Sequence, residues 1–421
     1  MLFNRSLETN IVPTQWKTAT IIPVPKTTTP KVPAEFRPIS LTSILSRTSE
    51  RLVICKNIYP AIESAEAYCD QFAFRPSGGT TAAIIAITSK IQKILETQNY
   101  ARVIAFDFSK AFDTVKHSSV LQRFEELQLP DQIYNWLVNF FSNRIHQTKF
   151  NGNISKAASI NASVIQGSAI GPIAFTAIAS SLKTVEEENC MIKYADDTYL
   201  IIAENKINST SAEIKNIVNW AKENNLRLNQ QKSKEILFCR PRYKQDLPQS
   251  IKDIPRCDTI NILGVTMDNK MRVQKHVQHS IMKCSSYLYG LKIMRSQGFS
   301  TINTHHFYKS VIVSRLLYAS PSWWGFTSEE DKRRIQAFIN RSIKYGYCSR
   351  EDQNVQSQVA TAHQQLFLKI VSNPHHVLHQ LLPPKRCYKY SLRPGKHEFT
   401  ISVLRNNAKR GFMDNMLHDL I

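Results

Sequence analysis

Two adjacent carboxylates, Asp196 and Asp197, interrupt a run of apolar, aromatic and β-branched residues at positions 191–202. Such a run on both sides predicts a β-hairpin with the acidic pair at its tip. Adjacent carboxylates repel one another, so keeping both ionised near a core costs free energy unless a cation compensates them. A hard divalent ion such as Mg²⁺ prefers oxygen ligands and suits the pair. A solvated turn is the alternative for an isolated Asp-Asp, and the rest of the chain has to decide.

A third carboxylate, Asp107, ends a short apolar run at 102–108 that predicts a buried strand. It precedes Asp196 by 89 residues, with helical patterns between them. That order suits two neighbouring strands of one sheet joined through helices. Three carboxylates at one sheet end could hold two Mg²⁺ ions about 4 Å apart, which activate an attacking oxygen and stabilise a leaving one.

The elements that must position these residues follow from periodicity, caps and turn residues. Helices are expected at 43–55, 80–95, 118–127, 132–141 and 171–182, and a capping box at 210–213 precedes another. Strands are expected at 19–24, 147–150, 234–239 and 260–268. From 275 to about 345 the pattern is helical, and the last 70 residues are polar, His-rich and irregular.

The charge balance predicts a polyanionic partner. The chain has 421 residues, with 54 Lys and Arg against 33 Asp and Glu, a net charge of +21. Positions 271–350 hold 13 basic and 3 acidic residues, so about half of the excess lies in one helical segment. Such a cluster favours a surface that faces phosphates over a solvated basic domain. With the acidic site, nucleotidyl transfer becomes the leading chemistry.

The composition indicates a cytoplasmic or nuclear protein. The N-terminus has no signal-peptide core, and the uncharged stretch at 157–182 contains Pro172, two glycines and polar residues, so no transmembrane segment is expected. The eight cysteines have no zinc or redox spacing. His305-His306 and His375-His376 lack partners at metal-ligand spacing, so no zinc site is expected either.

Seven blocks, in order over residues 10–325, resemble those of reverse transcriptases from non-LTR (LINE-type, jockey-like) retrotransposons. The blocks are Gln15-Trp16-Lys17 through Lys26 with Phe36-Arg37-Pro38-Ile39-Ser40-Leu41; Gln71-Phe72-Ala73-Phe74-Arg75-Pro76; Phe106-Asp107-Phe108-Ser109-Lys110-Ala111-Phe112-Asp113; Gln166-Gly167-Ser168 through Gly171-Pro172; Tyr194-Ala195-Asp196-Asp197; Leu228-Asn229-Gln230-Gln231-Lys232-Ser233; and Leu263-Gly264-Val265. The family's endonuclease normally precedes the first block, and the chain starts almost at that block. We therefore expect an isolated polymerase module or a fragment.

The resemblance implies a role for each matched residue. Asp107, Asp196 and the carbonyl of Phe108 are expected to bind two Mg²⁺ ions, or Mn²⁺ in their place. Asp197 is expected to be a further metal ligand or an electrostatic support. Phe112 is expected to exclude a ribose 2′-hydroxyl, and Gln166 to contact the incoming nucleotide. Arg75, with Arg37 and Lys26, is expected to clamp the triphosphate. Lys232 is a candidate proton donor to pyrophosphate.

Other interpretations stay open for several of these residues. Phe108 and Phe112 could be core aromatics, Lys232 a solvated lysine, and Arg37 a loop brace before Pro38. Asp113 lies in a helical pattern and is expected to be a local helix residue, not a metal ligand. Trp323-Trp324 and Tyr318 could stack on bases, although core packing is favoured.

The resemblance implies an α+β right-hand polymerase whose palm is an antiparallel sheet backed by helices. We expect fingers at 1–100, a palm at 101–272 with a fingers-side insertion around 118–160, a basic helical thumb at 273–345, and a partly irregular C-terminal extension at 346–421. The implied activity is RNA-directed DNA synthesis with dNTPs on an RNA template and a DNA primer. A catalytically silent nucleic-acid-binding remnant is the alternative, and a basic membrane scaffold ranks last because no suitable amphipathic helix is present.

Overall fold

The computed structural model describes residues 1–109, 111–241, 243, 247–349, 354–385, 399–400 and 411–419. The helices, with short 3-10 or π segments labelled η, are α1 (Leu2–Thr9), α2 (Thr14–Lys17), η1 (Pro33–Glu35), α3 (Ile44–Val53), η2 (Ile54–Ile58), α4 (Tyr59–Ser64), η3 (Glu66–Tyr68), α5 (Thr80–Thr97), α6 (Ala111–Thr114), α7 (His117–Glu125), α8 (Asp131–Phe141), α9 (Ile170–Ser180), η4 (Glu204–Ser209), α10 (Thr210–Glu223), α11 (Gln274–Ser296), α12 (Thr301–Phe307), η5 (Tyr308–Val313), α13 (Ser314–Leu316), α14 (Ser320–Trp323), η6 (Trp324–Phe326), α15 (Glu329–Lys344), α16 (Val355–Ser372), η8 (His379–Leu381) and α17 (Phe412–Asp419). The strands are β1 (Thr18–Pro25), β2 (Phe36–Leu41), β3 (Tyr100–Phe106), β4 (Phe108–Ser109), β5 (Arg144–Phe150), β6 (Asn153–Ile154), β7 (Ala158–Ile160), β8 (Cys190–Tyr194), β9 (Asp197–Ala203), β10 (Arg227–Leu228), β11 (Lys234–Cys239), β12 (Thr259–Ile262) and β13 (Val265–Asp268).

A four-stranded antiparallel sheet in the order β11-β3-β9-β8 lies at the centre of the molecule. Its strands are short and rich in apolar and β-branched residues, as strands buried on both faces require. The strand that precedes Asp107 and the strand that follows Asp196 are direct neighbours in this sheet. This confirms the predicted adjacency of the two acidic segments.

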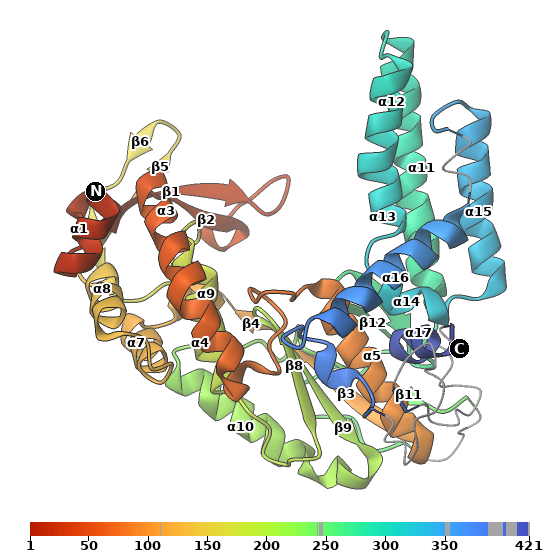
Figure 1. Ribbon diagram of the computed structural model, residues 1–421, viewed down its shortest axis with the longest axis horizontal. Coiled ribbons are helices and arrows are strands. Elements are labelled where there is room, and N and C mark those ends of the chain that lie inside the picture. The colour runs from red at the N-terminus through yellow and green to blue at the C-terminus, as the bar shows by residue number, and fades with distance from the viewer. Residues whose placement is uncertain are drawn as a thin grey trace, which may run out of the picture.

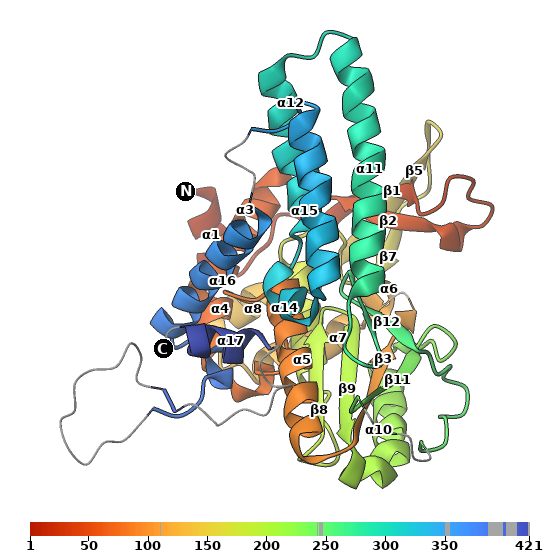
Figure 2. The same ribbon diagram turned by 90° about the vertical axis from the view of Figure 1, so that its right-hand side faces the viewer.

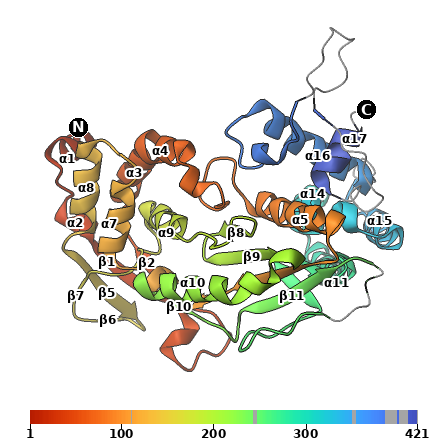
Figure 3. The same ribbon diagram turned by 90° about the horizontal axis from the view of Figure 1, so that it is seen from below.

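The two faces of the sheet pack into two different cores. Because side chains alternate along a strand, Ala101 and Val103 of β3 join one core with α5, while Ile104 and Phe106 join the other with α7, α9 and α10. Figure 3 shows α5 and α10 on opposite sides of the strands. Burial on both faces holds the strand ends in a fixed relation, and those ends carry the acidic residues.

A second sheet contains β2, β1, β5 and β6 in that order, with β7 paired to β5. β1 pairs antiparallel with β2 and parallel with β5, so residues 144–150 lie beside residues 18–25. This sheet and helices α1 and α8 lie at the opposite side of the molecule from the long helices of the 274–344 segment (Figure 1). The domain boundaries expected from the sequence remain predictions.

The helical segment after residue 273 forms a bundle of α11, α12 and α15 that projects away from the central sheet (Figure 2). Trp323 is only 1% exposed, and its indole Nε1 donates to the Tyr318 carbonyl at 2.8 Å. Trp324 is buried beside it. Core packing, and not base stacking, therefore accounts for both tryptophans.

Two local expectations from the sequence are wrong. Glu213 does not complete a capping box, because its carboxylate accepts hydrogen bonds from the backbone of Val185 and Glu186 and from the Asn189 amide. The single strand expected at 260–268 is instead a hairpin, in which β12 pairs antiparallel with β13. The C-terminal segment, expected to be partly irregular, contains α16, which spans 18 residues and buries Val355, Val359 and Ile370. Residues 350–353, 386–398, 401–410 and 420–421, which include Cys387 and positions 391–394, lie outside the described residues.

The expected α+β class is confirmed by this mixture of helices and antiparallel sheets. In the part of the chain that the structure describes, no helix combines the length and apolar content needed to cross a membrane.

Candidate active site

Asp107 lies where β3 ends. Phe106, the last residue of β3, pairs with Thr198 of β9, so Asp107 lies beside the start of β9. The Asp107 backbone is fixed on both sides, because its carbonyl accepts from Asn229 N at 2.8 Å and its N–H donates to Ser233 Oγ at 3.2 Å. The sixth sequence block therefore anchors the strand end that carries this carboxylate.

The acidic pair lies at the turn of the β8–β9 hairpin, as predicted. Tyr194 pairs with Asp197 across the hairpin, and Ala195 and Asp196 form the turn between them. Ala195 has φ of 56°, in the left-handed region that L-residues avoid. Surrounding structure must hold this turn, because the residue itself disfavours the conformation.

The electrostatics of the turn favour a cation. Burial, followed by the charge of Asp107, raises the pKa of Asp196 above its usual range. Burial, followed by the charges of Asp196 and Asp107, raises the pKa of Asp197 to about 6, although that side chain keeps an exposed face. The neighbouring charges acting on both groups are carboxylates, so bound positive charge would relieve the cost.

The donor set fits a hard divalent cation, since it consists of carboxylate oxygens at one strand end. Among residues with described side chains, however, no three His, Cys, Asp or Glu residues are gathered closely enough to hold a metal ion. The carboxylates are thus near one another and electrostatically coupled, but they do not form a closed ligand cage.

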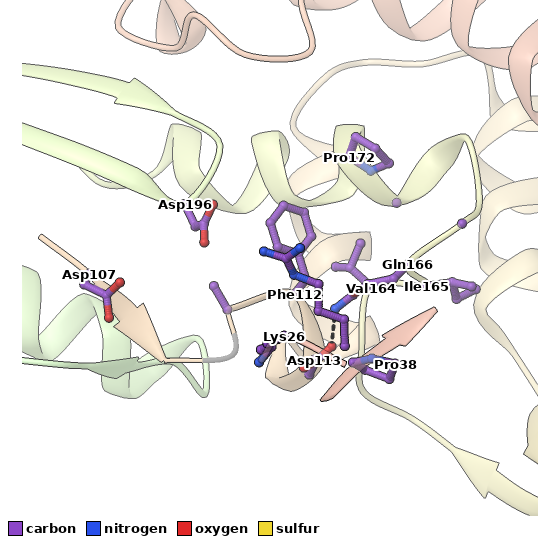
Figure 4. A pocket seen from close by; sticks show the side chains of 14 residues that line it. Lys26, Pro38, Asp107, Phe112, Asp113, Val164, Ile165, Gln166, Pro172 and Asp196 are labelled. Carbon is purple, nitrogen blue, oxygen red and sulfur yellow. Dashed lines mark hydrogen bonds between the residues drawn. The ribbon is translucent and has the colours of Figure 1, made fainter. Parts of the chain in front are cut away.

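A cavity of about 570 Å³ extends from these carboxylates towards the second sheet. Asp107 and Asp196 lie at one end, and Gln166 and Pro38 at the other (Figure 4). The residues lining it are Lys26, Arg37, Pro38, Asp107, Ala111, Phe112, Asp113, Val164, Ile165, Gln166, Gly167, Gly171, Pro172 and Asp196. Of the nine predicted site side chains, six line this cavity, namely Lys26, Arg37, Asp107, Phe112, Gln166 and Asp196. Asp197, Arg75 and Lys232 are not among its lining residues.

Two cations come to the cavity from the second sheet. Lys26 directly follows β1, and its ammonium donates to the Ala34 carbonyl at 3.1 Å. Arg37 lies on β2 opposite Val24 and is exposed. One cavity therefore joins a carboxylate end to side chains that suit phosphate oxygens.

The loop that carries Gln166 is fixed by close backbone contacts. The Gln166 carbonyl accepts from Ser40 N at 2.7 Å, and the Gly167 carbonyl accepts from Thr42 Oγ1 at 3.3 Å. Gly167 has φ of 130°, and a Cβ there would lie 2.2 Å from the Ser40 carbonyl oxygen. Only glycine fits at this position.

A buried glutamate that the sequence did not single out supports the same loop. Glu50 of α3 is fully buried, and its carboxylate accepts from Ala169 N at 2.6 Å and Ile170 N at 3.2 Å, where α9 begins. A carboxylate at a helix N-terminus satisfies free N–H groups and favours the helix dipole. No sequence signal predicts this, because the cap comes from 119 residues away.

Asp113 lies in a helix, α6, as expected, but its carboxylate also faces the cavity. It accepts from Gln166 Nε2 at 2.6 Å, the bond drawn in Figure 4. The ring of Phe112 lines the cavity and stacks on Phe175 with centroids 4.6 Å apart. The predicted gate residue is therefore packed on one side and open to the cavity on the other.

Three predicted residues have other surroundings. The Arg75 guanidinium donates to the backbone carbonyls of Tyr68 and Gln71, and Arg75 is not among the cavity residues. Lys232 is exposed on the segment before β11 and does not line the cavity either. The Phe108 ring is buried in the core against Trp220, which supports the packing interpretation of its side chain.

Comparisons with known proteins show similarity to reverse transcriptases. The family profile described as reverse transcriptase (RNA-dependent DNA polymerase) matches residues 24–267. The RNA-directed DNA polymerase from mobile element jockey of Drosophila melanogaster is 29% identical over 295 residues, covering 66% of this chain and 32% of the relative. The probable RNA-directed DNA polymerase from transposon BS of the same species is 24% identical over 362 residues, covering 82% and 40%.

Two further similarities extend over most of the chain. The Pol polyprotein of the type-1 retrotransposable element R2 from Popillia japonica is 24% identical over 356 residues, covering 79% of this chain and 48% of the relative. A Candida tropicalis telomerase in complex with a telomeric RNA fragment aligns with a TM-score of 0.46 at 12% identity, covering 88% and 65% of the two chains. The chain thus spans about a third to a half of the length of the curated relatives it matches.

Proposed function

The chain belongs to the reverse transcriptase (RNA-dependent DNA polymerase) family, and we propose that it catalyses RNA-directed DNA synthesis from a primer 3′-hydroxyl. Its α+β fold is the right-hand polymerase fold of that family. We assign the fingers to residues 1–100, the palm to 101–272 with the insertion around 118–160, the thumb to 273–345, and an extension to 346–421.

One observation carries the proposal. The cavity that begins at Asp107 and the Asp196 turn also reaches Lys26 and Arg37. A dNTP needs carboxylate-bound metal at its α-phosphate and positive charge along its β- and γ-phosphates. A nucleoside triphosphate therefore matches both the carboxylate end and the cationic end of this cavity.

Members of this family generally use divalent metal ions. We propose that Asp107, Asp196, Asp197 and the Phe108 carbonyl hold two Mg²⁺ ions, with Mn²⁺ as a substitute. When bound, such ions activate the primer hydroxyl and stabilise the departing pyrophosphate. The position of the acidic turn beside the end of β3 supports this assignment. Burial, together with the neighbouring carboxylate charges, raises the pKa values of Asp196 and Asp197.

The other cavity residues then bind and orient the nucleotide. Lys26 and Arg37 contact the triphosphate, Gln166 lies against the base pair, and the Phe112 ring contacts the sugar where a 2′-hydroxyl would project. The contacts of Arg75 with backbone carbonyls give its predicted role on the triphosphate no support. The position of Lys232 likewise gives no support to its predicted proton transfer to pyrophosphate.

We propose an RNA template and a DNA primer as macromolecular partners, and the cytoplasm or nucleus as the place of action. The 13 basic residues at 271–350 would contact phosphates, so template-primer binding should weaken steeply as salt rises. An A-form-like hybrid would be recognised by shape.

The test is primer extension on poly(rA)/oligo(dT) with Mg²⁺. We expect extension by the wild type and a loss of at least about 100-fold in Asp196→Asn, which removes one charge with little change in volume. Asp253→Asn is the matched control, since that aspartate lies away from the cavity. A folded protein that binds template-primer without extending it would support the catalytically silent remnant. Full activity in Asp196→Asn would make the metal assignment wrong.

A further inference from the structure

Gln71 connects the second sequence block to the acidic turn. Its side chain is fully buried. Its carboxamide oxygen accepts two backbone hydrogen bonds, from Ala195 N at 3.2 Å and from Ala73 N at 3.0 Å. Ala195 is the left-handed residue directly before Asp196.

The backbone around Gln71 is fixed to β8. Lys193 N donates to the Asp70 carbonyl at 2.8 Å, and Phe72 N donates to the Lys193 carbonyl at 2.8 Å. Residue 71 therefore bridges to residue 193 as a short parallel strand would. The buried Lys193 ammonium adds a bond of 2.9 Å to the Asp70 carboxylate. This anchoring brings the Gln71 side chain alongside the strand that leads into the turn.

The orientation of the Gln71 amide follows from its surroundings. Both backbone groups that it contacts are donors, so the oxygen must face them. The Nε2 group on the other side is buried without a hydrogen-bond partner. An unsatisfied buried donor costs about 1–3 kcal/mol, so the two hydrogen bonds that the oxygen accepts must offset the cost of burying Nε2.

We propose that Gln71 is a positioning residue for the metal-binding turn: its carboxamide oxygen holds the left-handed Ala195 and thereby sets the direction of the Asp196 carboxylate. The inference concerns geometry and rests on the proposed function only for its kinetic consequence. Without the acceptor, the Ala195 N–H is unsatisfied and the turn can relax to conformations that L-residues prefer. A displacement of about 1 Å at reacting groups can cost 100-fold in rate.

The decisive variant is Gln71→Met, which keeps the side-chain length and removes the acceptor. Gln71→Glu is the conservative partner, because it keeps an acceptor at the same distance. Gln92→Met is the matched control, since Gln92 is a buried glutamine of α5 whose amide oxygen lies beside Gly411. Each protein is measured by hydrogen–deuterium exchange of the peptide spanning 194–198 and by single-turnover nucleotide addition.

We expect Gln71→Met to accelerate exchange at the turn by at least about 10-fold and to lower the maximal rate of nucleotide addition by at least about 10-fold. The KM for dNTP should stay within about 2-fold, because the triphosphate contacts lie elsewhere. Gln71→Glu should restore wild-type exchange at the turn. Gln92→Met should change neither measurement.

Two results would overturn the inference. One is unchanged exchange at 194–198 in Gln71→Met. The other is a lower melting temperature with an unchanged addition rate per active molecule, which is the signature of a merely structural residue. If Gln71→Met does not fold, Gln71→Asn, whose shorter side chain withdraws the acceptor, is compared with Gln71→Glu by the same criteria. A wild type that extends no primer would reject the proposed function, while the exchange measurement would still decide the role of Gln71.

Discussion

The Gln166 amide donates a 2.6 Å hydrogen bond to the carboxylate of Asp113, across 53 positions of sequence and at the edge of the cavity. Because Nε2 of Gln166 donates to Asp113, the amide oxygen of Gln166 faces away from that carboxylate and can accept a hydrogen bond from another donor. The sequence marked Gln166 as a nucleotide contact and set Asp113 aside as an ordinary helix residue. In the structure the two side chains line the same cavity and are hydrogen-bonded to each other.

Asp113→Ala should therefore weaken nucleotide binding. Loss of a hydrogen bond to a charged group is worth about 1.5 kcal/mol or more, so KM for dNTP should rise about 10-fold while the maximal rate changes less. Asp113→Asn, which keeps an acceptor oxygen, should stay within about 3-fold of wild type. Steady-state KM measurements on both variants check this, and equal KM values in Asp113→Ala and wild type would contradict it.

Phe112 should set the choice between deoxyribo- and ribonucleotides. Its ring stands against Phe175 and borders the cavity, so removal of the ring opens space beside the sugar. Phe112→Ala should raise the relative kcat/KM for rNTPs by at least about 10-fold, the range expected for a steric contact. Phe112→Tyr keeps the ring and is the control. Unchanged discrimination in Phe112→Ala would leave Phe112 as a core aromatic only.

Gly167→Ala should destabilise the protein by about 3 kcal/mol, because a Cβ would meet a backbone oxygen that cannot move aside. Gly152→Ala separates the clash from backbone strain: it also has positive φ, but a Cβ there meets nothing within 4 Å. The control should lose only about 1–2 kcal/mol. Denaturant unfolding of both variants measures the difference in the free energy of unfolding. Equal losses would show that the close contact between residue 167 and the Ser40 carbonyl adds nothing to the cost of backbone strain.

Acid should destabilise the protein through a buried imidazole. Burial, with the nearby charges of His279 and Arg315, lowers the pKa of His276 from 6.5 to about 4. The unfolded chain therefore binds a proton between pH 6.5 and 4 that the folded state does not. The corresponding stability is complete above pH 6.5 and is lost as pH falls towards 4, by about 3 kcal/mol in all.

His276→Phe should remove that part of the pH dependence, since phenylalanine does not titrate and can keep the edge contact with Trp323. His306→Phe, at an exposed position of α12, is the control and should leave the pH profile unchanged. Urea unfolding at pH 7, 5.5 and 4.5 gives the comparison. Parallel profiles for wild type and His276→Phe would rule out His276 as a source of the acid sensitivity.

Much of the site was predictable because its functional residues lie in short contiguous sequence motifs. Periodicity placed Asp107 at the end of one strand and Asp196-Asp197 on a hairpin, and the structure has both features, with β3 beside β9. Of the six predicted side chains outside the acidic set, Lys26, Arg37, Phe112 and Gln166 line the cavity, whereas Arg75 and Lys232 do not. The Arg75 assignment had no local signal to guide it, because a guanidinium suits a carbonyl as well as a phosphate.

The sequence by itself determined the family, the leading chemistry and the strand ends that carry the carboxylates. Only the tertiary structure decided how those groups are held: Glu50 at the start of α9, Asp113 on Gln166, and Gln71 on Ala195. The physical reason is the range of the interactions. Periodicity and turn chemistry act within a few residues, whereas each of these bonds joins groups that are more than fifty residues apart and that meet only when the two cores have packed.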